Sequence, residues 1–320
     1  MDIPVLVVVP VYRDWRAFSH LMKDLDLVGR THGYRWTILA VNDGAALPEA
    51  GELKLPNGEH TVRSIEILEL ACNVGHQRAI AVGLVVASSR MDHACVVVMD
   101  ADGEDRPSDV ANLLQHQTQI AGPLVAIRQE RSERWSFRMC YFLYRLMFRL
   151  LTGRAIRFGN FCVLPMGSVR HLIYRGELWN NLAATLLRTS SSIVGVPTNR
   201  GRRYDGSSRM NLEALAVHGL GAVAVFSDIV FLRILAAAFA FGGATVTAIL
   251  VVVTIRLFTD LAIPGWASYM VGALLVMLFQ AVIIALASMF LLLGNRSAST
   301  FIPATDAMRY LVRQHIVYQK

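Results

Sequence analysis

The 320-residue chain is 54% hydrophobic and has a mean hydropathy of +0.43. These values exclude an ordinary soluble protein, so we expect part of the chain to lie in lipid. The formal net charge of +7 favours an anionic partner, either a membrane surface or a phosphorylated substrate. Nucleic acid would also fit this charge, but no recognition motif accompanies it, so we expect no nucleic-acid partner.

Short apolar runs alternate with helical patterns in the first part of the chain. The runs lie at 5–9, 36–41, 64–70, 94–99 and 124–128. Strands that alternate with helices at this spacing predict parallel βαβ units and a doubly wound α/β sheet. Polar side chains follow the first four runs; they are Tyr12 and Asp14, Asp43, Asn73 and His76, and Asp100 and Asp102. Since ligands of such sheets bind beyond the carboxyl ends of the strands, the pattern predicts a nucleotide-sized crevice.

The run at 94–99 leads into an acidic segment that holds Asp100, Asp102, Glu104 and Asp105. Asp100 and Asp102 are two residues apart on an extended segment, so their side chains can point the same way. That arrangement suits a hard divalent cation, which takes oxygen ligands from carboxylates and from substrate phosphates. An acidic surface loop after a core strand is the alternative, and the spacing alone does not separate the two.

Arginines gather in three later segments. The fifth apolar run ends in Arg128, with Arg131 and Arg134 just after it, and a very basic turn occupies 200–209. Between them, residues 135–151 mix aromatic side chains with arginines, which predicts an amphipathic helix. Its basic face could lie near lipid headgroups or could be an ordinary solvated face.

The last third of the chain predicts a membrane anchor. Residues 212–226 are amphipathic, and the uncharged stretches at 234–255 and 269–293 are each long enough to span a hydrocarbon core of about 30 Å. Arginines after 294 place both termini in the cytoplasm by the positive-inside rule, and no basic region precedes the first apolar run as in a signal peptide. We therefore predict a cytoplasmic α/β domain at 1–210, an interfacial helix at 211–233, a transmembrane hairpin at 234–293 and a basic tail at 294–320.

Several strand-end motifs carry a family resemblance. They are Val9-Pro10-Val11-Tyr12, Asn42-Asp43-Gly44, Asn73-Val74-Gly75-His76, the acidic segment 100–107, Gly159-Asn160-Phe161 and the basic segment 203–209. In this order they resemble the motifs of family 2 (GT-A) glycosyltransferases. The acidic and basic segments are similar to those of the polyprenyl-phosphate glycosyltransferases, the branch like dolichol-phosphate mannose synthase. The resemblance covers nearly the whole chain and implies a GT-A (Rossmann-like) domain followed by an interfacial helix and two transmembrane helices.

The resemblance also implies an activity and its residues. A metal-dependent, inverting transfer would move a sugar from a UDP- or GDP-sugar to the phosphate of a polyprenyl phosphate at the cytoplasmic membrane face, for cell-envelope glycan modification. Mg²⁺ or Mn²⁺ would be held by Asp100, Asp102 and Glu104. Donor-binding residues would be Pro10, Tyr12, Asp14, Asp43, Asn73, His76, Asp100 and Arg131. Catalytic residues would be Asp102, Asp105, Arg128, Arg203 and Arg209, whose guanidinium groups can pair with phosphates.

The chain departs from the family pattern at Asn42, Glu104 and Arg209, where the family usually has Asp, Gln and Lys, and Asp205 within the basic turn is unexplained. Transfer to another lipid, such as diacylglycerol or ceramide, is an alternative; a hydroxyl acceptor would need a base, with Asp105 or Glu177 as candidates. A processive polysaccharide synthase and a non-catalytic membrane scaffold are further alternatives. The sugar, the nucleotide and homo-oligomerisation stay open, with UDP slightly preferred.

Overall fold

The computed structural model describes residues 3–48, 52–53, 61–90, 92–117, 120–128, 135–190, 192–205, 212–259, 263, 265–297 and 301–319. Two of the predicted site residues, Arg131 and Arg209, lie outside these ranges. The chain forms two compact units. The first comprises Met1–Phe148, Arg154–Val225 and Thr300–Lys320, and the second comprises Arg149–Gly153 and Phe226–Ser299.

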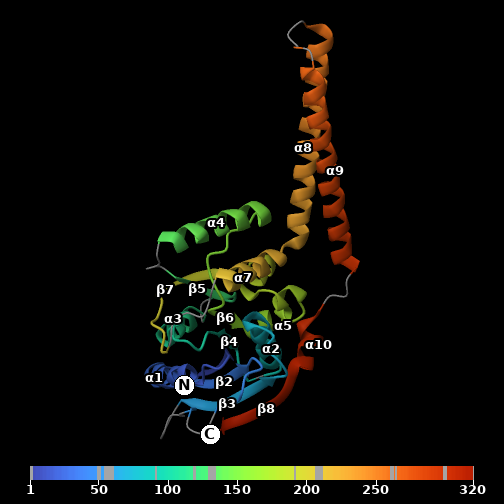
Figure 1. Cartoon of the computed structure of the whole chain (residues 1–320). Helices are drawn as coiled ribbons and strands as arrows, with labels where there is room; N and C mark the ends of the chain where they lie inside the picture. Colours follow the sequence, from blue (N-terminus) through green and yellow to red (C-terminus); the bar gives the residue numbers. More distant parts are fainter. Residues whose placement is uncertain are drawn as a thin grey trace. The chain divides into compact units, whose positions relative to one another are not determined.

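The first unit is built on one mixed, mostly parallel sheet (Figure 1). Its strand order is β7-β5-β6-β4-β1-β2-β3-β8. Four neighbouring pairs are parallel, whereas β6 runs antiparallel to both β4 and β5, and β8 runs antiparallel to β3. The strands are β1 (Ile3–Val11), β2 (Tyr34–Asn42), β3 (Val62–Leu70), β4 (Cys95–Val98), β5 (Leu124–Arg128), β6 (Cys162–Pro165), β7 (Val194–Thr198) and β8 (Leu311–Gln319).

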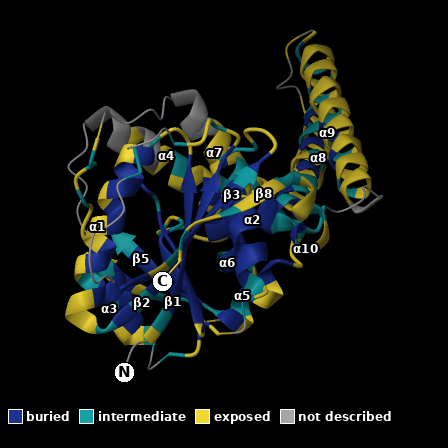
Figure 2. Cartoon of the chain, turned by 90° about the horizontal axis from the view of Figure 1, so that it is seen from below, coloured by how far each residue is buried: buried dark blue, intermediate teal, exposed yellow. Residues whose placement is uncertain are grey.

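Alternate residues of each central strand face two separate helical layers, because successive side chains of a strand point to opposite faces. Val5, Val7 and Val9 of β1 belong to one apolar cluster with α1 and α3, whereas Leu6 and Val8 belong to another with α2, α5 and α6. Both faces are therefore buried, as the dark strands in Figure 2 show. The helices are α1 (Trp15–His32), α2 (His76–Ser88), α3 (Pro107–Gln117), α5 (Met166–Leu172) and α6 (Leu182–Thr189).

This architecture confirms the predicted fold class in its main features, an α/β domain with a mostly parallel sheet and two long apolar helices towards the C-terminus. Chain order reverses on the two sides of β1, since β2 lies on one side and β4 on the other. Such a reversal is a topological switch point, where open α/β sheets form a crevice at the carboxyl ends of the strands. The acidic segment begins two residues after β4, at this point.

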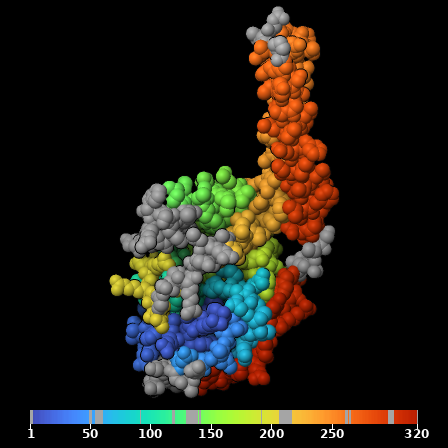
Figure 3. All heavy atoms as spheres, in the orientation of Figure 1, coloured from blue at the N-terminus to red at the C-terminus, as the bar shows by residue number. Residues whose placement is uncertain are grey.

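The C-terminal residues return to the sheet. After α10 (Pro303–Asp306) and a 3₁₀ turn at Ala307–Tyr310, strand β8 pairs antiparallel with β3 from Leu70↔Leu311 to Ser64↔Gln319. In Figure 3 its red spheres lie against the blue ones of the sheet edge. The sequence analysis placed these residues in a basic tail and did not predict a strand. A strand whose side chains are mostly exposed carries little alternating pattern.

Glu66 of β3 is a buried acid that this edge stabilises. Its side chain is 6% exposed, Arg90 Nη2 lies 2.5 Å from Oε2, and Gln314 of β8 donates a hydrogen bond to the same oxygen. Arg90→Ala leaves a buried carboxylate without its cation, so we expect unfolding to become easier by about 3 kcal/mol. Chemical denaturation in detergent measures this change in the free energy of unfolding. Arg309→Ala is the control, because Arg309 pairs with Asp306 but is 80% exposed, and a change of similar size there would contradict the explanation.

The second unit contains two helices that are long and apolar enough to cross a membrane, α8 (Ser227–Phe258) and α9 (Trp266–Ser297), with mean hydropathies of 2.2 and 2.6. Most of their side chains are exposed, as the yellow helices in Figure 2 show. The predicted interfacial segment 211–233 is divided in the structure. Helix α7 covers Leu212–Ala224, and residues from Ser227 onward belong to α8.

Candidate active site

Asp105 is the most deeply buried acid at the end of β4. Its side chain is 3% exposed, Oδ1 accepts a hydrogen bond from Arg128 Nη2 at 3.1 Å, and Oδ2 accepts one from the Asp100 N–H at 3.0 Å. Burial raises the pKa of Asp105, the nearby Asp100 carboxylate raises it further, and Arg128 opposes both. Asp105 therefore shapes the turn that presents Asp100 and holds Arg128 of β5 beside it.

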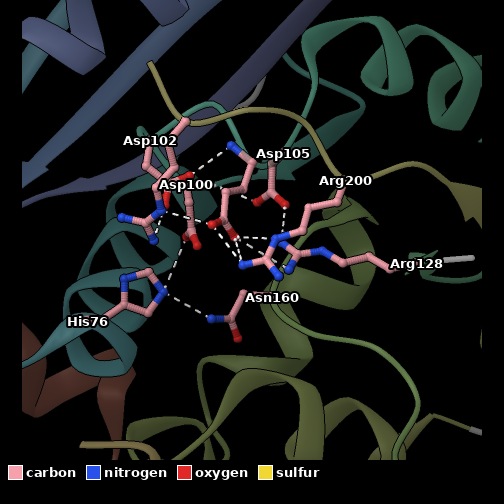
Figure 4. Close-up of polar contacts among 9 residues, drawn as sticks. His76, Asp100, Asp102, Asp105, Arg128, Asn160 and Arg200 are labelled. Atoms are coloured by element: carbon pink, nitrogen blue, oxygen red, sulfur yellow. Dashed lines mark hydrogen bonds and ion pairs between the residues drawn. The ribbon is translucent and has the colours of Figure 1, made fainter. Parts of the chain in front are cut away.

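Glu104 and Asp102 pair with arginines from the basic turn after β7 (Figure 4). Arg200 donates to both carboxylate oxygens of Glu104, with its Nη2 at 2.8 Å from each, and Arg203 Nε donates to Oε1 at 2.8 Å. Arg203 Nη2 also lies 2.8 Å from Asp102 Oδ2. Burial raises the pKa of Glu104, but the hydrogen bonds from Arg200 and Arg203 outweigh it and the pKa is lowered, so Glu104 is ionised.

A polar network from α2 reaches the same acids. His76, the first residue of α2, has Nε2 at 3.3 Å from Asp100 Oδ1 and at 3.0 Å from Asn160 Nδ2. Gln77 Nε2 donates to Asn160 Oδ1, and Gln77 Oε1 accepts from the Leu182 N–H. Burial raises the pKa of Asp100, and the Asp102 carboxylate raises it further.

Asp43 braces the loop that starts α2. The residue is 4% exposed, and its two carboxylate oxygens accept the N–H groups of Val74 at 2.7 Å and Gly75 at 3.1 Å. Gly75 has φ +93°, a conformation that glycine adopts without strain, and it precedes His76 directly. These two hydrogen bonds therefore fix where α2 begins, and so they fix the position of His76.

The predicted metal ligands differ in how well they suit a divalent cation. Asp100 Oδ1 is a buried carboxylate oxygen whose neighbour is His76 Nε2, 3.3 Å away, and oxygen donors of this kind are those that Mg²⁺ and Mn²⁺ prefer. Asp102 lies two residues after Asp100. It would become a second ligand if the cation replaced Arg203 as its partner. Glu104 does not fit, because guanidinium groups occupy both of its oxygens. Among the described residues, no group of three or more His, Cys, Asp or Glu side chains is arranged to hold a metal.

The structure brings part of the predicted set together. Asp100, Asp102, Glu104, Asp105, Arg128, Arg203 and His76 are linked by the contacts above. Pro10 is buried near the end of β1, and Asp14 precedes α1. Tyr12 and Asn73 are exposed in strand-end loops. The predicted site residues did not include Arg200, Asn160 or Gln77. Arg200 shares a basic turn with Arg203, and Asn160 lies in the Gly159-Asn160-Phe161 motif, so both had a sequence signal.

No known family model matches the chain. Similar solved structures include a mycobacterial protein, with 12% identity, a TM-score of 0.50, and coverage of 71% of this chain and 74% of that one. They also include mannosyl-3-phosphoglycerate synthase from Rubrobacter xylanophilus (14% identity, TM-score 0.49, 70% and 72% covered). A third is glucosyl-3-phosphoglycerate synthase from Mycobacterium tuberculosis in complex with Mn²⁺, UDP and glucosyl-3-phosphoglycerate (12% identity, TM-score 0.48, 71% and 80% covered). At such low identity the likeness concerns the fold alone.

Proposed function

We propose that this protein is a membrane glycosyltransferase that moves a sugar from a nucleotide-sugar donor to the phosphate of a polyprenyl phosphate. The observation that carries the proposal is the acid and arginine cluster at the switch point of the sheet. Asp102 and Glu104 pair there with guanidinium groups from β5 and the basic turn, and Asp100 contacts His76 at the same strand end. A mixed set of this kind suits a donor diphosphate, which the arginines can pair with and a cation can bridge to the acids.

The lipid part of the proposal rests on exposed apolar surface. Helix α4 (Trp135–Thr152) exposes large apolar side chains at helical spacing, namely Met139, Phe142, Leu143, Leu146 and Met147. The green spheres of Figure 3 show this helix at the surface. Arg145 on the same helix supplies a cation. An apolar face next to arginines suits an anionic lipid surface, and α8 and α9 supply the anchor.

The proposed reaction needs little proton chemistry. An oxygen of the acceptor phosphate attacks C1 of the donor sugar, the bond from C1 to the donor phosphate oxygen breaks, and the nucleoside diphosphate leaves with that electron pair. Arg128, Arg200 and Arg203 would bind and orient phosphate oxygens of donor and acceptor. A divalent cation, bound by Asp100 and Asp102, would supply neutralisation of charge on the departing diphosphate. The acceptor phosphate is already an anion at neutral pH, so no general base is required.

The hydroxyl-acceptor alternative finds less support in the geometry. Asp105 is buried with both oxygens engaged, so it is poorly placed to take a proton from a substrate. Glu177 keeps 28% exposure but pairs with Arg188, with Oε1 3.5 Å from its Nε.

A transfer assay tests the proposed function. The full chain in liposomes with undecaprenyl phosphate is given labelled UDP- and GDP-sugars, with Mg²⁺ or Mn²⁺. We expect one donor to label the lipid phase and EDTA to abolish the labelling. Labelling of diacylglycerol or ceramide instead would contradict the acceptor and retain sugar transfer. A chain that binds no donor would contradict the proposal and favour the scaffold alternative.

A further inference from the structure

Glu104 carries more cationic contacts than the other described acids of the site. Besides its hydrogen bonds from Arg200 and Arg203, its Oε2 lies 3.6 Å from Arg128 Nη1. The side chain is 12% exposed, so solvent screens these contacts only in part. Arg200 and Arg203 are like charges that would repel each other if no anion lay between them.

The backbone shows that residues 200–204 pack directly on the acidic turn. The Gly201 N–H donates to the Glu104 carbonyl at 2.9 Å, and the Tyr204 N–H donates to the Asp102 carbonyl at 2.9 Å. A Cβ at Gly103 would come within 2.7 Å of the Tyr204 ring, and one at Gly201 within 2.1 Å of the Gly103 oxygen. Residues 200–204 and 102–104 therefore form one packed unit, and Glu104 is the side chain that links them twice.

We propose that Glu104 is a positioning residue that holds Arg200 and Arg203 where the donor diphosphate binds, and that it is not a ligand of the divalent cation. This inference rests on the proposed function. A cation at ligand distance from Glu104 would lie beside two guanidinium groups that already neutralise the carboxylate. Instead, the Glu104 carboxylate holds the guanidinium groups of Arg200 and Arg203 close together. When the donor binds, its diphosphate can replace the carboxylate as the hydrogen-bond acceptor of both arginines.

Glu104→Gln tests this role because it keeps the shape of the side chain and removes its charge. The Gln amide places an NH₂ group against a guanidinium, so we expect one arginine contact to be lost. Losing a charge-assisted hydrogen bond corresponds to roughly a tenfold rise in the donor KM, with kcat reduced by less than about threefold. Arg200→Gln should give a similar rise, and the double variant should be little worse than either single one.

Two readouts do not depend on activity. Hydrogen exchange on the full chain without ligand reports the Gly201 and Tyr204 amides, and we expect both to exchange faster in Glu104→Gln. Mn²⁺ binding to the same protein, followed by electron paramagnetic resonance, should keep its affinity. Asp205→Asn is the matched control, since Asp205 is an exposed acid in the same basic segment. It should change neither the exchange rates nor the donor KM.

The outcomes separate the possibilities. Faster exchange, a raised donor KM and unchanged Mn²⁺ affinity would support the positioning role. Weakened Mn²⁺ binding with unchanged exchange would make Glu104 a metal ligand and overturn it, as would a variant indistinguishable from the native chain in all three readouts. If the native chain binds no nucleotide-sugar, the proposed function fails and the donor-facing role fails with it, while the exchange rates still decide whether Glu104 anchors residues 200–204.

Discussion

Asp102→Asn is expected to lower sugar transfer by about 10²–10³-fold while leaving the protein folded. Asp102 Oδ2 lies 2.8 Å from Arg203 Nη2, and Oδ1 accepts the Glu104 N–H at 2.9 Å. Asn can still accept the backbone hydrogen bond through its one oxygen. It loses the negative charge that pairs with Arg203 and that would bind a cation on the donor diphosphate.

The measurement is kcat/KM for the donor in proteoliposomes, with a thermal melt to confirm that the variant is folded. Glu177→Gln is the matched control, because Glu177 is also a partly exposed acid paired with an arginine. We expect its activity to stay within about twofold of the native protein. Retained activity in Asp102→Asn would contradict the proposed site. Loss of activity in Glu177→Gln would point to a proton acceptor and hence to a hydroxyl as the acceptor group.

Local sequence patterns were enough to predict the parallel part of the sheet and the acidic turn. The central strands are buried on both faces, so Val5–Val9 and Val96–Val98 read as unbroken apolar runs, which are easy to recognise. The position of Asp100 and Asp102 followed, because they come directly after such a run. The two long apolar helices were predicted for a similar reason, although α8 begins at Ser227, before the stretch that lacks charged residues.

Contacts between distant segments could not be predicted in this way. Arg200 and Glu104 are 96 residues apart, and nothing in either local pattern states that they meet. The same holds for β8, which pairs with β3 across more than 240 residues, through contacts such as His315 with Glu69. Periodicity reports which face of an element is buried but not which element covers it. The family resemblance implies that Glu104 is a metal ligand, and the local sequence pattern does not show the arginine partners that the structure places around it.

Asp43→Asn is expected to make unfolding easier by roughly 2–3 kcal/mol and to weaken donor binding as a consequence. In the native protein each carboxylate oxygen of Asp43 accepts one backbone N–H, from Val74 and from Gly75. Asn has a single oxygen, so its NH₂ group would face the second N–H in a buried site. A cost of that size lowers the melting temperature by about 4–12 °C in a domain of this length.

The expected loss of donor binding follows from where this brace lies. Gly75 directly precedes His76, whose Nε2 is 3.3 Å from Asp100 Oδ1. A change in the loop would therefore displace His76 from its contact with Asp100. Asn73→Ala is the matched control, because Asn73 lies in the same loop but is exposed, and its melting temperature should change little. Melting curves in detergent and the donor KM together separate two roles for Asp43. A variant that melts like the native protein yet binds donor poorly would contradict the role of Asp43 in stabilising the loop. It would instead assign Asp43 to direct contact with the nucleotide, as the family resemblance implies.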